Sequence, residues 1–208
     1  MSWRFIVRST FIVSLLFMAV GCTAAGPPEF RDGDIIFHTS TSSQSEALRL
    51  ATGSPYTHMG IIFIESDGPV VLEAVGPVKR TPLIEWIKRG EDGKFVVKRL
   101  AGSQAQLTSD AIARLKEAGA RYSGRPYDLQ FRWSDERIYC SELVWKMYKD
   151  AMDIEVGEVK TFRDFNLSDP TVAGKLEERF GAGVPLDEKV VSPASVFESE
   201  RLVTVYHN

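Results

Sequence analysis

Cysteine and histidine are scarce in this sequence. Of its 208 residues, two are cysteine, Cys22 and Cys140, and three are histidine. Because Cys140 has no second thiol at metal-ligand spacing, we expect no metal site. No glycine-rich strand-to-helix turn matches a nucleotide loop, so no cofactor is expected. The net charge is −3 and no basic tract is present, which argues against nucleic acid as a partner.

Long apolar runs are also scarce. The one candidate, residues 11–20, follows Arg4 and Arg8 and is too short for a confident transmembrane helix. A basic start, a short apolar core and small residues after it are typical of a secretory signal, with an uncleaved membrane anchor as the alternative. Residues 19–22 resemble a bacterial lipobox, although Ala19 stands where leucine is usual. The resemblance implies cleavage before Cys22 and lipidation of that residue.

The expected domain organisation follows from this N-terminus. Residues 1–21 are predicted to be a signal peptide, 22–30 a lipidated tether and 31–208 a single domain of ordinary globular composition, 44% hydrophobic and 25% charged over the whole chain. We expect an exported bacterial lipoprotein, anchored to the membrane through Cys22 on the periplasmic side. Residues 23 and 24 lack the aspartate associated with inner-membrane retention, which favours the outer membrane.

Cys140 is then the only unmodified thiol in an exported protein, where structural cysteines normally pair. It stands at the start of an amphipathic run in which Leu143, Val144, Met147 and Tyr148 fall on one helix face. Free backbone N–H groups and the positive dipole end at a helix start stabilise a thiolate. The alternative is that Cys140 is a buried small apolar residue.

Two polar side chains interrupt a predicted β-hairpin. Residues 56–65 and 70–75 read as strands that are apolar on both faces, which predicts a covered sheet. His58 and Glu73 share a face if the pairing sum is odd. A two-residue turn at residues 67 and 68 would place them about 13 Å apart along the strand, whereas a wider loop would place them opposite each other. Taken separately, His58 reads as a surface or edge histidine and Glu73 as a strand-end carboxylate facing water.

The remaining pattern predicts a mixture of helices and strands. Residues 45–51, 81–87 and 172–180 read as short helices, with Pro82 at the first helical position of the second. A longer helix is capped by Thr108 or Ser109. The further strands expected are residues 35–38, 94–100 and 202–206, and a brief helix starts at residues 192–193.

A thiol, an imidazole and a carboxylate are the parts of a Cys–His–acid hydrolase. In that arrangement His58 takes the proton of Cys140 and returns it to the leaving group, while Glu73 orients the imidazole. Backbone N–H groups at the helix start, including that of Cys140, are suited to form an oxyanion hole.

Several separated motifs resemble one family. Residues 124–127 (GRPY) and 140–144 (CSELV) are similar to the signature of NlpC/P60 papain-like cysteine peptidases. In those enzymes the cysteine precedes the histidine, whereas here 54–61 (SPYTHMGI) and 72–74 (LEA) precede Cys140. That order resembles the circularly permuted YiiX/YaeF-type amidases over residues 31–206. The resemblance implies an α+β fold, with an antiparallel sheet and the nucleophile helix packed against it.

By the same resemblance, Cys140 is the nucleophile, His58 the base and Glu73 the orienting residue. His38 is the reserve base, assigned to structure or to the site rim. Tyr56, Tyr127 and Tyr139 are candidates for lining the cleft, although aromatic residues near apolar strands are more often core.

Three functions remain open from the sequence. The first is an envelope amidase or peptidase acting on a peptide, a peptidoglycan fragment or an acylated small molecule. The second is an acyltransferase or phospholipase-like enzyme with the same thioester chemistry. The third is a non-catalytic, membrane-tethered binding module. A wide apolar cleft would favour lipid, and a narrow cleft with a carboxylate or arginine would favour peptide.

Overall fold

The computed structural model describes Met1 and residues 29–208. The predicted signal peptide and the lipidation of Cys22 lie outside the described residues. Phe30, assigned above to the tether, packs against Phe95 and Tyr206, with ring centroids 6.4 and 6.1 Å away. Among the helices that the structure describes, none combines the length and apolar character needed to cross a membrane.

A six-stranded sheet forms the centre of the domain, and every neighbouring pair of its strands is antiparallel. Its order is β4-β3-β2-β1-β5-β8. These strands are β1 (Ile35–His38), β2 (His58–Glu65), β3 (Gly68–Ala74), β4 (Val78–Pro82), β5 (Val96–Leu100) and β8 (Leu202–His207). A separate pair joins β6 (Lys160–Thr161) and β7 (Lys189–Val190).

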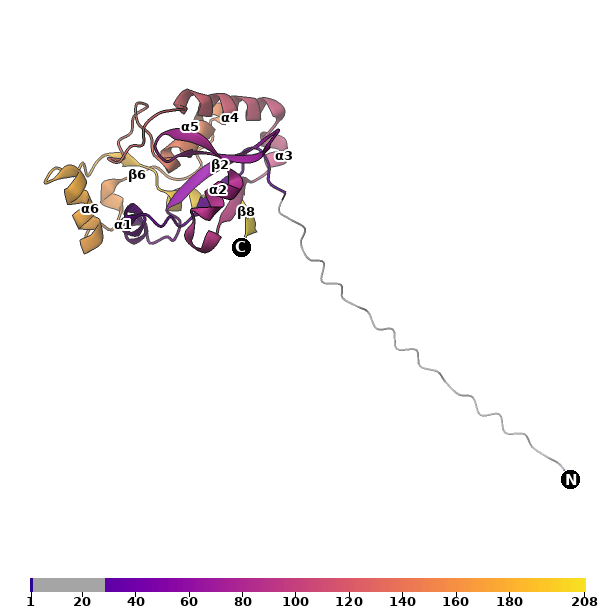
Figure 1. The fold of residues 1–208 in the computed structure, drawn as a ribbon, viewed down its shortest axis with the longest axis horizontal. Helices are drawn as coiled ribbons and strands as arrows, with labels where there is room; N and C mark the ends of the chain where they lie inside the picture. The colour runs from indigo at the N-terminus through magenta and orange to yellow at the C-terminus, as the bar shows by residue number, and fades with distance from the viewer. Residues whose placement is uncertain (2–28) are drawn as a thin grey trace.

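Helices cover both faces of the sheet. They are α1 (Ser43–Thr52), α2 (Leu83–Lys88), α3 (Ser103–Gln106), α4 (Ser109–Tyr122), α5 (Cys140–Met152), α6 (Pro170–Phe180) and α7 (Pro193–Phe197), with 3₁₀ turns η1 (Glu91–Gly93) and η2 (Phe162–Asp164). In Figure 1, α4 and α5 lie on one side of the sheet and α2 on the other, and α1 and α6 lie together at one end. The predicted α+β class, with an antiparallel sheet and the Cys140 helix packed against it, is confirmed.

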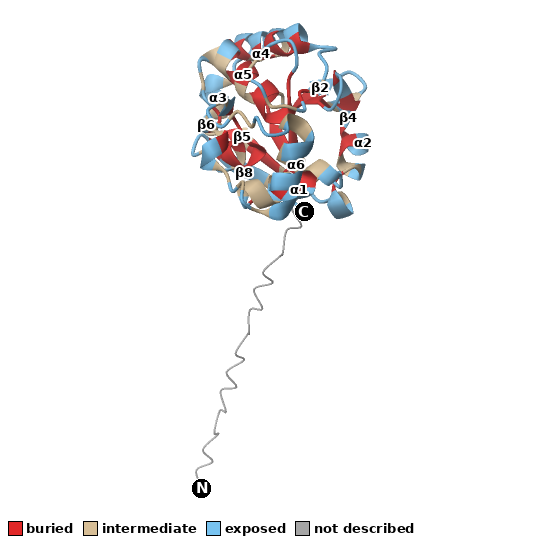
Figure 2. Cartoon of the chain, turned by 90° about the vertical axis from the view of Figure 1, so that its left-hand side faces the viewer, coloured by how far each residue is buried: buried red, intermediate tan, exposed pale blue. Residues whose placement is uncertain are grey.

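Successive side chains along the strands point to opposite faces of the sheet, so the sheet contributes to two hydrophobic cores. Ile35 and Phe37 face the larger core with Leu143 and Met147 of α5, whereas Ile36 faces a smaller core under α2. This division explains why the strands are apolar on both faces. Figure 2 shows the resulting buried interior inside an exposed outer layer.

The β2–β3 hairpin has neither of the two predicted registers. Glu65 pairs with Gly68, so the two-residue turn is formed by residues 66 and 67, one position earlier than expected. Ile61 therefore pairs with Leu72, and Glu73 stands opposite Gly60. The odd pairing sum places His58 and Glu73 on one face as diagonal neighbours.

The segment before α2 also differs from expectation. Pro82 is the last residue of β4 and the N-cap of α2, which starts at Leu83. β4 was not predicted, because its buried Val78 and Thr81 are separated by the exposed pair Lys79 and Arg80. That spacing does not give the alternation expected of a strand.

Candidate active site

Cys140 is the first residue of α5, directly after the N-cap Tyr139. Its side chain is a free thiol and only 3% exposed. The first backbone hydrogen bond of the helix runs from the Leu143 N–H to the Tyr139 carbonyl. The backbone N–H groups of residues 140–142 therefore have no acceptor within the helix. The thiol therefore sits at the positive end of the helix dipole, where negative charge on sulfur is stabilised.

His58 lies between this thiol and a carboxylate. As the first residue of β2, it stands at the end of the sheet nearest the start of α5. Its Nε2 atom is 2.7 Å from Oε2 of Glu73, and the Cys140 side chain lies close enough to the ring to contribute to its raised pKa. Because Nε2 is used by Glu73, Nδ1 is the ring nitrogen left for the thiol.

Glu73 is fully buried, and both of its carboxylate oxygens are used. Oε2 faces His58, while Oε1 accepts a 2.6 Å hydrogen bond from the Thr81 hydroxyl and contacts Nη2 of Arg89. Thr81 comes from β4 and Arg89 from the end of α2, so three elements fix one carboxylate. Such a fully bonded carboxylate holds a defined orientation.

These contacts determine the protonation states of His58 and Glu73. Burial opposes the charged form of His58, but hydrogen bonds and charge from Cys140 and Glu73 outweigh it and raise its pKa to about 9. Burial likewise opposes ionisation of Glu73, but His58, Thr81 and Arg89 lower the pKa of Glu73 to about 2. A carboxylate and an imidazolium are therefore the favoured forms at neutral pH.

A second imidazole stands next to this pair. His38 is directly opposite His58 on β1, 2% exposed, and stacked on Trp86 with ring centroids 3.9 Å apart. Burial, together with the charges of His58 and Arg89, lowers the pKa of His38 to about 3. A neutral, stacked ring of this kind forms one wall of the site, in line with the assignment to structure or rim.

An apolar cleft opens on the cysteine side. Cys140 forms part of its wall, and His58 does not. Most of its wall is apolar, although Lys175 and Arg179 of α6 also line it. The apolar residues come from α1, η2, α6, β7, the start of α7 and the loops between elements; they are Ala47, Leu48, Ala51, Phe131, Phe162, Phe165, Leu167, Val172, Leu176, Val190, Val191 and Pro193.

A polar groove opens on the other side of the imidazole. His58 forms part of its wall and Cys140 does not. The remaining wall includes the hydroxyl-rich residues 40–42, Lys88 and Arg89. Gln44 and Tyr127 line both spaces, so the cleft and the groove meet at these two residues.

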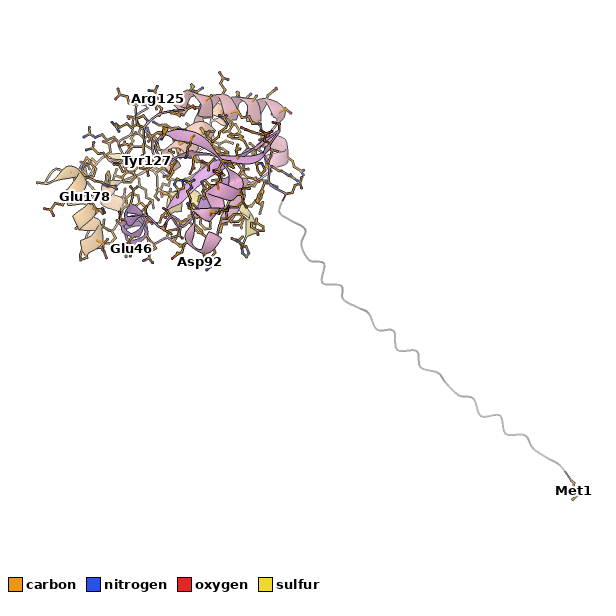
Figure 3. The ribbon with its side chains drawn as sticks, in the orientation of Figure 1. Met1, Glu46, Asp92, Arg125, Tyr127 and Glu178 are labelled. Carbon is orange, nitrogen blue, oxygen red and sulfur yellow. The ribbon has the colours of Figure 1, made fainter. Side chains whose placement is uncertain are left out.

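The boundary between the two spaces is held by side-chain hydrogen bonds. Nη2 of Arg179 donates to Oε1 of Gln44 over 2.9 Å, and Nε2 of Gln44 donates to the Tyr127 hydroxyl over 3.1 Å. Figure 3 shows Tyr127 further toward the middle of the molecule than Glu178 on α6 and Glu46 on α1. Burial and the nearby Cys140 charge both raise the pKa of Tyr127, which keeps its hydroxyl protonated.

The other two tyrosines predicted to line the cleft have different surroundings. Tyr139 does line it, 1% exposed, with its hydroxyl accepting from the Val191 N–H over 3.2 Å. Tyr56 is stacked on Phe197 at 4.0 Å and is not part of either wall. It packs against the larger core instead.

Sequence reasoning missed Thr81, Arg89 and Gln44. In the sequence each is a polar residue of a kind that is common at protein surfaces, and only the tertiary fold brings it to the site. Gly60 carried a signal that was not used, because a glycine inside a strand often marks a close approach of neighbouring groups.

A solved structure supports the fold. The crystal structure of metalloprotein yiiX from Escherichia coli O157:H7 matches with a TM-score of 0.82 and 49% identity, covering 86% of this chain and 97% of that one. That relative is described as a metalloprotein. Within residues 29–208 of this chain, no group of three or more His, Cys, Asp or Glu side chains is arranged to hold a metal ion.

Sequence comparisons agree with the structural match. The chain is 46% identical over 199 residues to the uncharacterized protein YiiX of Escherichia coli strain K12, and the alignment covers 96% of both chains. The family model for permuted papain-like amidase enzymes, YaeF/YiiX, family C92, matches residues 29–206. The resemblance noted in the sequence is thereby confirmed, and this chain belongs to the permuted papain-like amidase family of the YaeF/YiiX type.

Proposed function

We propose that this protein hydrolyses an amide bond through a thioester on Cys140, with His58 as general base and Glu73 as the residue that orients it. One observation carries the proposal: the His58 ring lies between the Cys140 thiol, whose proximity helps to raise its pKa, and the Glu73 carboxylate, which is 2.7 Å from its Nε2 atom. Membership of an amidase family supports a cysteine hydrolase in general terms. The assignment of roles to these three residues rests on their geometry.

The chemical steps follow from that arrangement. In the starting state the imidazolium of His58 already holds the thiol proton on Nδ1, and the Cys140 thiolate attacks the substrate carbonyl carbon. The carbon–nitrogen bond then breaks, and His58 gives its proton to the departing amine. In the second half-reaction His58 removes a proton from water, which attacks the thioester. The products are the amine and the carboxylic acid, and the thiol is restored.

The start of α5 supplies charge stabilisation for these steps. The carbonyl oxygen becomes negative in the tetrahedral intermediate, and the Cys140 N–H at the first residue of α5 is a backbone donor suited to stabilise it. Donors fixed before the reaction stabilise such an oxyanion without reorganisation. Glu73 contributes indirectly, because its negative charge stabilises the imidazolium and its fixed position selects the ring tautomer.

The walls of the cleft indicate the acyl part of the substrate. Cys140 bonds the acyl carbon, so the acyl group occupies the space next to the sulfur. That space is the apolar cleft formed by residues such as Leu48, Leu167 and Leu176. Each apolar methylene moved from water into it contributes about 0.8 kcal/mol. We therefore infer that the substrate is an amide with an apolar acyl group, and the second candidate, acyl transfer or acyl-lipid hydrolysis, uses the same cleft.

The cellular setting belongs to the same proposal. If Cys22 is lipidated, the domain is tethered to the periplasmic side of the envelope, with the outer membrane favoured. Peptides, peptidoglycan fragments and acylated small molecules are the substrates accessible there. The apolar cleft favours the acylated molecules among them.

Trapping the thioester tests this function directly. The full-length protein is mixed with N-acyl aminocoumarins of increasing acyl length, quenched in acid and digested, and the mass of the Cys140 peptide is measured. We expect a mass increase equal to the acyl group and release of the coumarin. Cys140→Ala should abolish both, and His58→Ala should slow both by about 10²–10⁴-fold.

Acyl-length preference tests the cleft. Leu176→Lys places a charge in the apolar wall, and we expect the preference for long acyl chains to fall by about tenfold or more. Val203→Lys on β8 is the matched control, since Val203 is 48% exposed and outside the cleft. If no thioester forms and Cys140 alkylation is unaffected by His58→Ala, the non-catalytic binding module becomes the better account.

A further inference from the structure

The groove beside His58 has a chemical character that the amidase proposal does not use. His58 protonates the departing amine, so the amine part of the substrate must lie on the imidazole side of the reacting bond. The groove contains His58 and not Cys140, while the cleft contains Cys140 and not His58. The acyl part and the amine part of the substrate are therefore bound in different surroundings.

Charge in the groove has one sign. Lys88 and Arg89 line it, and none of its wall residues is an aspartate or glutamate. Lys88 is exposed and makes no ion pair within residues 29–208. Arg89 contacts the buried Glu73 through Nη2 alone, and its side chain remains 37% exposed. The Glu73 carboxylate offsets the positive charge of Arg89, so the groove keeps a net positive charge from Lys88.

Two further features increase the positive potential. Helix α1 starts at the groove, and its N-cap Ser42 makes no side-chain hydrogen bond to the first turn. The partial positive charge at that helix end therefore faces the same space as Lys88 and Arg89. Ser40 and Thr41 also line the wall; the Ser40 hydroxyl donates to Ser42 Oγ over 3.3 Å, and the Thr41 hydroxyl is suited to hydrogen-bond an oxyanion.

We propose that the groove is a binding subsite for a negatively charged leaving group, so that the preferred substrate is an N-acyl amine whose amine part carries a carboxylate or phosphate. This inference rests on the proposed function, because it uses His58 as the acid that protonates the amine. The substrate would then be amphipathic, with its apolar acyl group in the cleft and its anion in the groove.

Three matched compounds test the subsite. N-octanoylglycine carries a carboxylate on the amine part, N-octanoylglycinamide is its neutral counterpart, and N-octanoyl ethylenediamine is cationic. Two quantities are measured on the full-length protein: kcat/KM for hydrolysis by the wild type, and the dissociation constant for each compound with Cys140→Ala. We expect the anion to be preferred over the neutral amide by about tenfold or more in both, and the cation to be the poorest.

Two substitutions and a change of ionic strength test whether Lys88, rather than another cation of the protein, causes the preference for the anionic compound. Lys88→Gln should lower the anion-to-neutral preference by about fivefold, and raising the ionic strength should lower it as well. Lys149→Gln is the control, because Lys149 pairs with Asp153 and Glu155 at the far end of α5. Its preference should equal that of the wild type. Equal use of the anionic and neutral amides, or a preference unchanged by Lys88→Gln, would overturn the subsite.

The two measurements distinguish the two proposals. Hydrolysis of all three compounds without discrimination leaves the amidase standing and removes the anion subsite. Selective binding of the anion by Cys140→Ala without any wild-type hydrolysis supports the subsite and contradicts the amidase. Absence of binding for all three contradicts the subsite. A phosphate-bearing analogue, N-octanoyl ethanolamine phosphate, then decides between the two anions by its affinity relative to the glycine compound.

Discussion

The Glu73 carboxylate passes over Gly60 to reach His58, two positions before Gly60 at the start of β2. Glu73 stands opposite Gly60, and its Oε2 atom lies 2.7 Å from Nε2 of His58. A Cβ atom on Gly60 would lie 3.3 Å from the Cβ of Glu73, 2.4 Å from Cγ1 of Val71 and 2.7 Å from the Leu72 carbonyl oxygen. The absence of a side chain at this position therefore allows the diagonal hydrogen bond.

The first prediction concerns this glycine. Gly60→Ala should destabilise the fold by about 2–3 kcal/mol, because the backbone oxygen of Leu72 cannot yield to the new methyl group without strain. The same change should reduce activity beyond the loss expected from unfolding. Urea denaturation and kcat/KM at a temperature where both proteins are folded measure the two effects.

Gly174→Ala provides its control. Gly174 lies within α6, where an added Cβ meets no atom within 4 Å. Replacing a glycine in a helix by alanine should stabilise by about 0.5–1 kcal/mol. Equal stability changes for the two variants would show that Gly60 is not a steric requirement.

Much of this fold is predictable from the sequence, and the reason is physical. Strand β2 is recognisable as a continuous apolar run, because both of its faces are buried, and helix α5 shows helical periodicity, because one face packs against the core. The position of Cys140 at the first residue of α5 follows from that pattern alone. The family resemblance added the pairing of Cys140 with His58, which lie far apart in the chain and which no local pattern connects.

The hairpin register illustrates what local patterns do not determine. Residues 66–68 allow a tight turn at two adjacent positions. Moving the turn by one position slides one strand past the other by two residues and leaves every side chain on its face, so the apolar pattern does not choose between the two registers. In the observed register Gly60 packs under Glu73, a contact that no local pattern predicts. Arg89 and Thr81 were missed for the same reason, since their partner is set by the tertiary fold.

The second prediction concerns the carboxylate itself. In Glu73→Gln, Thr81 and Arg89 still donate to one oxygen, so the amide nitrogen faces Nε2 of His58. Nε2 must then accept, which places the ring proton on Nδ1, the atom that should receive the thiol proton. We expect kcat/KM to fall by about 10²–10⁴-fold with the fold retained. Activity close to that of the wild type would contradict the orienting role.

The third prediction concerns the pH dependence set by Arg89. The pKa of Glu73 is lowered to about 2 despite its burial, by His58, Thr81 and Arg89. Its ionised form therefore stabilises the folded site above the unfolded pKa of about 4.3, and this is lost as the pH falls through the folded value. Arg89→Gln should raise the pKa of Glu73 and move the acidic limb of kcat/KM upward by up to about one pH unit.

The substitution Arg89→Lys distinguishes the effect of the positive charge at this position from the effect of the side chain's shape. Arg89→Lys keeps the cation, so most of the acidic limb should return toward that of the wild type. Arg201→Gln, at an exposed position outside both walls, is the control. An Arg89→Gln profile that loses amplitude without moving along the pH axis would indicate a structural effect only.

The last prediction concerns a buried carboxyl group two residues after Cys140. Glu142 is fully buried and lies 2.8 Å from Nζ of Lys146, which also contacts Asp135 at 2.7 Å. Burial outweighs the attraction of Lys146 and raises the pKa of Glu142 to about 7. In the unfolded chain this proton leaves near pH 4.3.

Between these two pH values the folded state holds the extra proton, so this group makes stability fall as the pH rises, until it levels off above about pH 7. Glutamine resembles the protonated form and does not lose this stability. We therefore expect Glu142→Gln to match the wild type at pH 4.5 and to exceed its free energy of unfolding by about 2 kcal/mol at pH 8. Urea denaturation at both pH values measures this difference, with the exposed Glu177→Gln on α6 as control. A variant less stable than the wild type at pH 8 would show instead that the ion pair with Lys146 outweighs the burial of the charge.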